Sequence, residues 1–358
     1  MASEETLKLV EDNAETVLEE IGIEFRDDPD AVALFRTAGA AVDGERIRFP
    51  KGMCREIIRA SAPQEYVQHA RNPSRSVRIG GKHTVLAPAY GPPFVQDLDN
   101  GRRYATLEDF QNFTKLTYQS QALHHSGGTL CEPVDIPVNK RHLDMVYSHL
   151  RFSDKPFMGS VTAPERAQDT VDMAKLVFGE RFVDENCVIT SLINANSPMT
   201  YDATMLGAAR VYASNNQATV ISPFILAGAM SPVTVMGTCT QILAEAMAGI
   251  PFYPADTPGC TGCIRNFQQR SVHAVRRTDF RDSGTFLGSL YLCRAVTPTG
   301  SALQKRWRPL RFQTGRCAGG LRVGKYASSR YDGRCELHAP HNGMAGGRAV
   351  YGLREIYP

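Results

Sequence analysis

Three apolar segments at a nearly constant spacing constrain the fold of this chain more than any other feature of its sequence. They are KPFMGSV (155–161), CVITSLI (187–193) and ATVISPFIL (218–226), and their first residues lie about 32 residues apart. Each segment is apolar throughout, which is typical of parallel strands buried on both faces. Segments of helical period separate them, so the pattern predicts repeated β/α units.

Repeated units of this length favour a (β/α)8 TIM barrel. A doubly wound sheet is the competing architecture, but no glycine-rich phosphate-binding turn follows any of the three segments. The pattern predicts helices from Pro164 to about Phe182, over residues 203–215 and over residues 233–250. It stops after Ile250. We therefore expect an α/β fold, an incomplete barrel with an N-terminal helical and hairpin region and an irregular basic tail.

The first part of the chain has shorter elements. Apolar residues at three- and four-residue spacing predict a helix over residues 7–21, and Gly22 ends it. A second short helix is expected over residues 28–35, followed by a strand, a turn and a helix within residues 46–61.

A hairpin region is expected over residues 70–105, where Asp99-Asn100-Gly101 supplies a turn. Thr106 then caps the next helix, with Asp109 at the capping-box position.

The composition indicates a soluble cytoplasmic protein. Acidic residues, rather than a basic and then apolar leader, occupy the first turns of the chain. The longest uncharged run, residues 218–244, is interrupted by Pro223 and Pro232, so we interpret it as a strand, a loop and a helix rather than a membrane span. Nine cysteines without a secretory signal indicate reduced thiols.

The net charge of +3 conceals a sharp division at residue 250. Residues 1–250 hold 23 Lys and Arg against 31 Asp and Glu, which gives −8, whereas residues 251–358 hold 17 against 6, which gives +11. Five of the nine cysteines and the single tryptophan, Trp307, also lie in the last part. A change this abrupt occurs at a domain boundary or where the reading frame changes.

Cys260 and Cys263 form a Cys-x-x-Cys in this last part. A structural zinc site needs a second pair of ligands, and the spacings of the remaining candidates match no zinc ribbon. These candidates are Cys293, Cys317, Cys335, His338 and His341. We therefore expect no metal site, although zinc binding remains an alternative.

Two further motifs have a weaker interpretation. The basic tail with Trp307, Phe312 and Tyr326 could bind nucleic acid as an arginine-rich segment. A non-enzymatic protein whose tail binds nucleic acid or zinc is thus the alternative function. GGKHT (80–84) resembles a phosphate loop only superficially and is expected at the end of a hairpin strand.

Residues 1–250 resemble the trimethylamine methyltransferase family, which includes glycine betaine methyltransferases. Five ordered motifs show the resemblance: VLEEIGIEF (17–25), APAYGPPFVQDLDNGRRYATLEDF (87–110), SDKPFMGSV (153–161), INANSPMTYD (193–202) and SPFILAGAMSPVTVMGTCTQILAEAMAGI (222–250). Members of this family are (β/α)8 barrels, and the resemblance ends at Pro251.

The resemblance implies transfer of a methyl group from trimethylamine, glycine betaine or a similar methylated amine to the cobalt of a corrinoid protein. It implies that the chain itself binds no cofactor and that a partner protein carries the methylcobamide. Trimethylamine enzymes of the family contain a pyrrolysine, which this chain lacks. The choice of amine and the formation of a homo-oligomer stay open.

Active sites of such barrels lie at the carboxyl ends of the strands, so the loops after the strands supply the candidates. For the substrate they are Tyr90, Phe94, His124, Asn194, Asn196 and Tyr201. For the corrinoid they are Ser126, Ser197 and Ser231, and no residue is singled out as catalytic.

Two interpretations of these residues stay open. In the functional one, Tyr90 and Phe94 surround the cation, while Asn194 and Asn196 bind a carboxylate or a water. In the structural one, the two rings pack in a hairpin and the asparagines cap a strand end. For His124 and the neighbouring His125, a satisfied structural histidine is the favoured interpretation over a ligand or a base.

We expect three parts in the chain. Residues 1–120 form the N-terminal helical and hairpin region, residues 121–250 form barrel units, and residues 251–358 form a disordered tail that a shifted reading frame produces. One codon choice for residues 252–267 reads FTQLTRPGAPVAFGT when it is started one nucleotide later, and this string is similar to the family at this position. We therefore expect a poorly soluble, inactive chain, because the missing units leave an open sheet edge.

Sequencing the gene across codons 245–260 tests this hypothesis. We expect a one-base insertion or deletion near the codon of Phe252. An uninterrupted gene in close relatives that encodes the same basic tail would contradict it.

Overall fold

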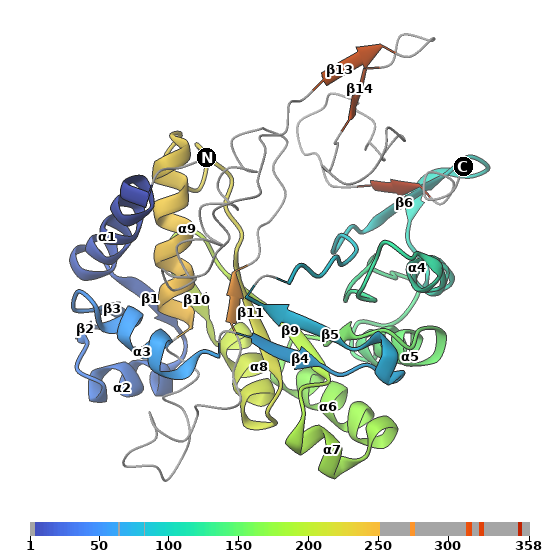
Figure 1. Cartoon of the computed structure of the whole chain (residues 1–358), viewed down its shortest axis with the longest axis horizontal. Coiled ribbons are helices and arrows are strands. Elements are labelled where there is room, and N and C mark those ends of the chain that lie inside the picture. The colour runs from blue at the N-terminus through green and yellow to red at the C-terminus, as the bar shows by residue number, and fades with distance from the viewer. Residues whose placement is uncertain are drawn as a thin grey trace.

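The computed structural model describes residues 4–63, 65–81, 83–250, 273–275, 313–316, 322–325 and 350–352. Its centre is a parallel sheet in the order β12-β11-β9-β8 (Figure 1). These strands are His273–Val275, Ala218–Pro223, Ile189–Ala195 and Phe157–Met158. Every residue of β11 is buried, as are all but one of β9. The prediction of parallel, doubly buried strands is thus confirmed.

A further segment extends this sheet beyond β8. The backbone N–H of Ser126 donates to the carbonyl of Pro156 at 2.8 Å, and that of Met158 donates to the carbonyl of Gly127 at 2.8 Å. Residues 126–128 therefore run beside β8. The strands that the structure describes make an open sheet, so a closed barrel is not shown.

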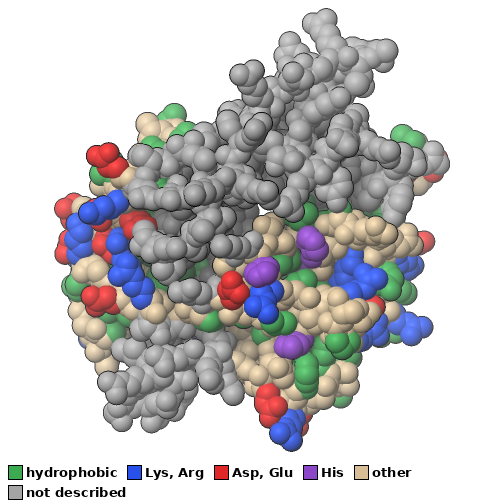
Figure 2. Space-filling model, viewed as in Figure 1, with side chains coloured by type: hydrophobic (Ala, Val, Ile, Leu, Met, Phe, Trp, Pro, Cys, Tyr) green, Lys and Arg blue, Asp and Glu red, His purple; other side chains and the backbone are tan. Residues whose placement is uncertain are grey.

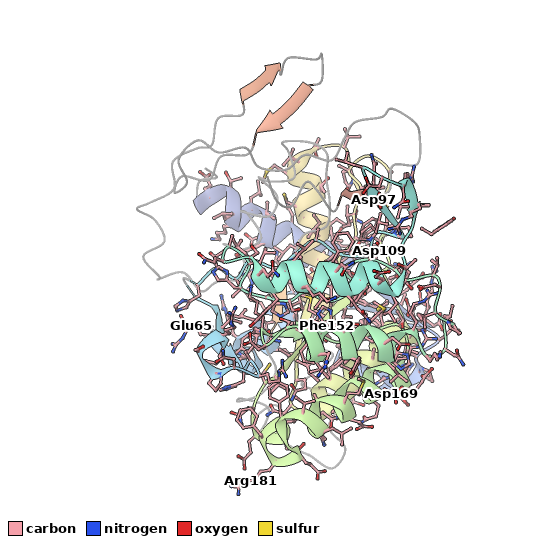
Figure 3. The ribbon with its side chains drawn as sticks, turned by 90° about the vertical axis from the view of Figure 1, so that its right-hand side faces the viewer. Glu65, Asp97, Asp109, Phe152, Asp169 and Arg181 are labelled. Atoms are coloured by element: carbon pink, nitrogen blue, oxygen red, sulfur yellow. The ribbon has the colours of Figure 1, made fainter. Side chains whose placement is uncertain are left out.

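Helices cover the sheet as β/α units require. Figure 3 shows α4, α5 and α6 stacked one below another, with Asp109 of α4 and Asp169 of α6 at the same end of the stack. The helices of this part are α4 Leu107–Gln119, α5 Arg141–Phe152, α6 Pro164–Phe178, α7 Glu180–Glu185, α8 Ala203–Ser214 and α9 Val235–Gly249.

Two of these helices differ from the prediction. The helix expected from Pro164 to Phe182 is interrupted at Gly179, whose φ of 88° lies in the region that favours glycine. The chain there divides into α6 and α7. Helix α5 was not predicted, because its buried residues are two histidines, a serine and a single valine, which form no apolar stripe.

The three helices and the last strand of the N-terminal region follow the prediction, whereas its strands β1 and β2 were not predicted. They are α1 Glu4–Glu20, β1 Ile23–Arg26, α2 Pro29–Thr37, β2 Ala41–Asp43, β3 Arg46–Arg48 and α3 Met53–Ser61. The sheet that they form has the order β10-β1-β3-β2, in which β10 (Thr200–Asp202) follows β9 in the chain and pairs parallel to β1. Helix α1 lies beside α9 (Figure 1). The N-terminal region is therefore joined to the barrel units through the β1–β10 pairing and through the packing of α1 against α9.

Aromatic packing makes one core of the two regions. The ring of Phe25 in β1 lies 4.9 Å from that of Phe35 in α2 and 5.6 Å from that of Tyr201 in β10. All three side chains are fully buried. Because large aromatic side chains contribute strongly to core stability, unfolding one region would expose the packing surface of the other.

Two hairpins occur around the predicted hairpin region, and the first begins before its predicted boundary at residue 70. They pair β4 (Glu65–Gln68) with β5 (Val77–Gly80), and β6 (Phe94–Asp97) with β7 (Gly101–Tyr104). The predicted turn at Asp99-Asn100-Gly101 is confirmed.

Two local predictions near these hairpins are also resolved. The Thr106–Asp109 capping box is present at the start of α4. GGKHT lies at the end of β5, where Gly80 forms an isolated bridge with His83, whereas Lys82 lies outside the described residues.

Gln68, at the end of β4, ties the first hairpin to the sheet. Its side-chain N–H groups donate to the carbonyls of Phe157 (2.9 Å) and Val188 (3.2 Å). Its carbonyl oxygen accepts from the Thr190 hydroxyl at 2.8 Å and lies 3.1 Å from His125 Nε2. Gln68 is fully buried, so this hydrogen-bonded amide fixes the hairpin across the amino ends of β8 and β9.

Four short strands lie in the part of the chain where the sequence shows no periodic pattern. Besides β12, they are β13 (Gln313–Arg316) and β14 (Arg322–Lys325), which pair with each other, and β15 (Val350–Gly352), which pairs with β6. The Cys260–Cys263 motif and its candidate partner ligands lie outside the described residues.

The buried pair of Asp28 and Arg210 tests how firmly the two regions are joined. Asp28 caps α2 through the Ala31 N–H at 2.9 Å and accepts two hydrogen bonds, of 2.8 and 2.6 Å, from Arg210 on α8. We expect Asp28→Ala to lower the free energy of unfolding by about 2–4 kcal/mol, because it removes the two charge-assisted hydrogen bonds from Arg210 and the cap of α2. Urea denaturation of the full chain measures this loss.

The exposed pair of Arg181 and Glu185 on α7 provides the control. Arg181→Ala is expected to change the free energy of unfolding by less than about 1 kcal/mol. Equal losses in the two variants would contradict the role of Asp28.

Candidate substrate site

A cavity of about 70 Å³ lies at the carboxyl end of β8. The residues that follow β8 and the first turns of α5 and α6 surround it, together with Gly128, Thr129 and Tyr90. This is the end of the sheet at which barrel enzymes place their active sites. The volume has room for a ligand group of a few non-hydrogen atoms.

The floor of the cavity depends on His149 of α5, which sequence reasoning missed. Its Nε2–H donates to the carbonyl of Gly128 at 2.7 Å, so Nδ1 is free to accept from the Ser126 hydroxyl at 2.7 Å. Burial lowers the pKa of His149 to about 4. This neutral imidazole therefore fixes the strand end of residues 126–128 against α5.

A weak sequence signal marks this face of α5. His142, Met145, Val146 and His149 follow the three- and four-residue spacing of one helix face, and all four line the cavity. Because two of the four residues are histidines, the sequence of this face does not show the apolar stripe that predicts a helix.

Besides His149, three basic side chains line the cavity. Arg141 pairs with Glu132 at 2.5 Å, and His142 Nε2 lies 2.7 Å from a carboxylate oxygen of Asp169. Arg166, on the first turn of α6, donates to the Thr162 hydroxyl at 2.9 Å. Among the described residues no carboxylate pairs with Arg166.

Tyr90 is the predicted substrate residue that lies at this cavity. Its ring passes so close to Gly128 that a Cβ there would lie 2.5 Å from Tyr90 Cε2. The next backbone N–H, that of Gly91, donates to the carbonyl of Thr129 at 2.6 Å. The loop with Tyr90 is therefore held directly over the strand end.

Phe94, predicted together with Tyr90, lies elsewhere. Its ring packs 4.6 Å from that of Tyr104 in the β6–β7 hairpin, and the Arg102 guanidinium lies 4.2 Å above it. The structure thus does not bring the two predicted aromatic residues together around the cavity, and Phe94 has the hairpin contacts of the structural interpretation.

Four further candidates lie at the end of β9, in the loop after it and in β10. Asn194 Oδ1 is buried and has no hydrogen-bond partner among the described residues. The amide of Asn196 donates to Asp202 at 2.5 Å. The Ser197 hydroxyl donates to Glu245 at 2.5 Å, and the Tyr201 hydroxyl donates to the carbonyl of the same residue at 2.9 Å.

Glu245 organises this loop and was also missed. It is fully buried on α9 and accepts from Ser197 Oγ, from the Met199 N–H at 2.9 Å and from Gln241 Nε2 at 2.9 Å. Burial raises its pKa, and the three donors offset only part of that effect. The sequence contains a signal for its importance, since Glu245 is the single charged residue of the otherwise uncharged helix α9.

The remaining candidates lie away from the cavity. His124 Nδ1 accepts from the Leu86 N–H at 3.0 Å, and the Ser231 hydroxyl lies 3.0 Å from that of Thr238. His125 is buried, with Nδ1 accepting from the Gly127 N–H at 2.9 Å and Nε2 directed at Gln68. These contacts agree with a structural histidine at position 125.

No metal site appears in the described part of the chain. No group of three or more His, Cys, Asp or Glu residues there could hold a metal ion. On the face shown in Figure 2, both acidic and basic side chains occur on the described surface. Within the same residues, no helix is both long and apolar enough to cross a membrane.

The described cysteines are free thiols. They are Cys54, Cys131, Cys187 and Cys239. Burial raises the pKa of Cys187 to about 12 and that of Cys239 to about 11, so neither is a reactive thiolate at neutral pH.

Glu245 gives a pH-dependent prediction. The usual pKa of Glu is 4.5 and the folded state raises it, so above pH 4.5 the folded chain binds more protons at this site than the unfolded chain. Its contribution to stability therefore falls as the pH rises from 4.5 through the folded pKa. We expect Glu245→Gln to remove this decline, as measured by urea denaturation between pH 4.5 and 8.

Glu185→Gln, at an exposed position on α7, is the matched control and should follow the wild-type curve. A wild-type chain and a Glu245→Gln variant that differ by the same amount at every pH would contradict the assignment.

Comparison with known proteins identifies the family. The family model described as "Trimethylamine methyltransferase (MTTB)" matches residues 1–272, which extends beyond the limit at Ile250 that the sequence motifs suggested. A glycine betaine methyltransferase of Desulfitobacterium hafniense (strain Y51) is 43% identical over 258 residues, which are 72% of this chain and 53% of that protein. A proline betaine:corrinoid methyltransferase of Eubacterium limosum is 24% identical over 264 residues, 71% of this chain and 53% of that protein.

Two solved structures share the fold. The monomethylamine methyltransferase (MtmB) of Methanosarcina barkeri has a TM-score of 0.54 at 9% identity and covers 83% of this chain and 59% of its own. A hydroxylamine complex of MtmB has a TM-score of 0.52 at 9% identity, with coverages of 81% and 57%. The chain spans about half the length of the curated relatives that it matches. From the family model and the 43% identity, the chain belongs to the trimethylamine methyltransferase family.

Proposed function

We propose that the protein acts in the transfer of a methyl group from a betaine, a quaternary amine that carries a carboxylate, to the cobalt of a corrinoid held by a partner protein. The main support is the 43% identity over 258 residues to a glycine betaine methyltransferase. The other curated relative is named for a betaine and a corrinoid as well. Trimethylamine, without a carboxylate, is the substrate that these two names do not favour.

Methyl transfer from a betaine requires few functions of the protein. The quaternary nitrogen of a betaine is already a good leaving group, so the site needs no acid to protonate it. The protein must hold the cation, align one N–CH3 bond and exclude water. When bound, the corrinoid of the partner protein would supply the acceptor of the methyl group.

Tyr90 is suited to holding the cation. It is half-buried, it lines the cavity at the carboxyl end of β8, and its loop is fixed by the Gly91 hydrogen bond to Thr129. The face of an aromatic ring attracts a permanent cation, more strongly when water is excluded. We assign Tyr90 to the trimethylammonium group on these grounds.

The polar candidates divide into two groups. Asn194 has a buried oxygen without a partner in the described structure, which supports a direct contact with substrate or with a bound water. The hydroxyls of Ser126 and Ser197 are occupied by His149 and Glu245. These two hydrogen bonds support a positioning role for the serines rather than a contact with the corrinoid.

The division of the chain at residue 250 belongs to the same proposal. We infer that residues 1–120 and 121–250 make up the enzyme's N-terminal region and barrel units, and that residues 251–358 derive from a shifted reading frame. The reversal of charge from −8 to +11 supports this. It follows that the chain with its present tail is a cytoplasmic but inactive member of an enzyme family.

A comparison of two chains tests the function. We expect the chain with the reading frame restored after Phe252 to methylate a reduced corrinoid protein with glycine betaine, and the chain with its present tail not to do so. The absorbance change of the corrinoid on methylation measures the transfer.

Two results would contradict this proposal. One is the absence of transfer with glycine betaine, proline betaine and trimethylamine alike in the frame-restored chain. The other is full activity in the chain that keeps residues 251–358 as they are.

A further inference from the structure

The loops after β8 and β9 differ in charge. The loop after β9 has two carboxylates in contact with its polar side chains, since Asp202 binds Asn196 and Glu245 binds Ser197. The loop after β8 leads into α6 and presents Ser160, Thr162 and Arg166 to the cavity. An anion is therefore favoured at the second loop and repelled at the first.

Arg166 is the group that distinguishes this loop. The other arginine at the cavity, Arg141, is held by Glu132 at 2.5 Å and by two hydrogen bonds to the carbonyl of Ile136. Within the described residues, the Arg166 guanidinium makes one hydrogen bond, to the neutral Thr162 hydroxyl. Its guanidinium keeps most of its five N–H donors for a ligand, and their planar arrangement matches a carboxylate.

The loop is held rigidly enough to position these donors. The Tyr212 hydroxyl donates to the carbonyl of Ser160 at 2.6 Å, and the N–H of Ser160 donates to Thr170 Oγ1 at 3.3 Å. The N–H of Gly159 donates to the carbonyl of Thr190 at 2.9 Å. A Cβ at Gly159 would lie 2.2 Å from the Tyr212 hydroxyl oxygen, so only glycine fits there.

The start of α6 adds to the positive potential. Its N-cap, Ala163, has no side-chain acceptor, and Pro164 occupies the first helical position. The amino end of a helix favours an anion, because the N–H groups of the first turn have no partners within the helix. Here this effect accompanies a cavity with an arginine and two hydroxyls, rather than acting alone.

The cavity also limits the kind of anion. Its volume of about 70 Å³ has room for a carboxylate. Glu132 lines the same cavity, so its negative charge opposes a dianion such as phosphate more strongly than a monoanion. Tyr90, on the same cavity, provides the aromatic face for the other end of a zwitterion.

We propose that Arg166, with Ser160 and Thr162, forms a carboxylate-binding subsite at the carboxyl end of β8, and that this subsite selects betaines over amines without a carboxylate. The second half of this statement rests on the proposed function, whereas the first does not. Arg166 is thus a specificity-determining residue, and the carboxylate lies at the β8 loop rather than at Asn194 and Asn196.

Acetate tests the subsite without any methyl donor. Binding to the full chain is followed by the line broadening of the acetate methyl resonance in NMR titrations. We expect saturable binding to the wild type that becomes about 10- to 100-fold weaker in Arg166→Gln, which is the loss that follows from removing a charge-assisted pair. Arg181→Gln, at an exposed position on α7, should bind acetate as the wild type does.

Two further variants separate a lost ligand contact from a lost fold. Arg166→Lys keeps the charge but not the planar pair of donors, so it should bind acetate between the wild type and Arg166→Gln. Thr162→Val should weaken binding by several-fold without changing the circular dichroism spectrum. Three results would overturn the subsite. They are no binding of acetate, equal binding of acetate to the wild type and Arg166→Gln, and weaker binding of acetate than of inorganic phosphate.

A competition experiment connects the subsite to the betaine. Glycine betaine should displace acetate from the wild type, whereas choline, which has the same cation without the carboxylate, should not. Displacement by both would overturn the selectivity. Acetate binding to Arg166 in a frame-restored chain that transfers no methyl group would leave the subsite in place and refute the proposed function instead.

Discussion

The burial of parallel strands on both faces is the constraint on which the rest of the structure depends. Every residue of β11 and nearly every residue of β9 is buried, so helices and the N-terminal region must cover both faces of this sheet. The N-terminal elements contribute to this cover through α1 beside α9 and through Phe25 against Tyr201. They belong to the same core as the barrel units.

Each end of this sheet is fixed by a buried polar group with nearly all of its hydrogen bonds made. Gln68 fixes the amino ends of β8 and β9, and the neutral His149 fixes the strand end at the cavity. Glu245 does the same for the loop after β9. Burial makes an unpaired polar group costly, so these networks specify one arrangement of loops around the site and leave little freedom for others.

The loops after β8 and β9 differ in the charges that surround them. Carboxylates already occupy the surroundings of the β9 loop, whereas the β8 loop presents Arg166, two hydroxyls and the start of α6. A zwitterion with its cation at Tyr90 and its carboxylate at Arg166 matches this division of charge. The site thus combines an aromatic face and a guanidinium on a single rigid scaffold, which lowers the cost of ordering the ligand.

The sequence by itself determined the β/α order, the parallel strands, the capping box at Thr106 and the family, because these depend on local periodicity and on ordered motifs. The sequence did not predict the helix break at Gly179, because a positive φ is not visible in a hydrophobic pattern. It did not predict α5 either, because a buried face with two histidines has no apolar periodicity. Only the tertiary structure placed Tyr90 at the cavity but Phe94 in a hairpin, and showed that Arg166 has no carboxylate partner among the described residues. Contacts of this kind join segments that are far apart in the chain. The residue pattern within one segment therefore cannot predict which residues come into contact.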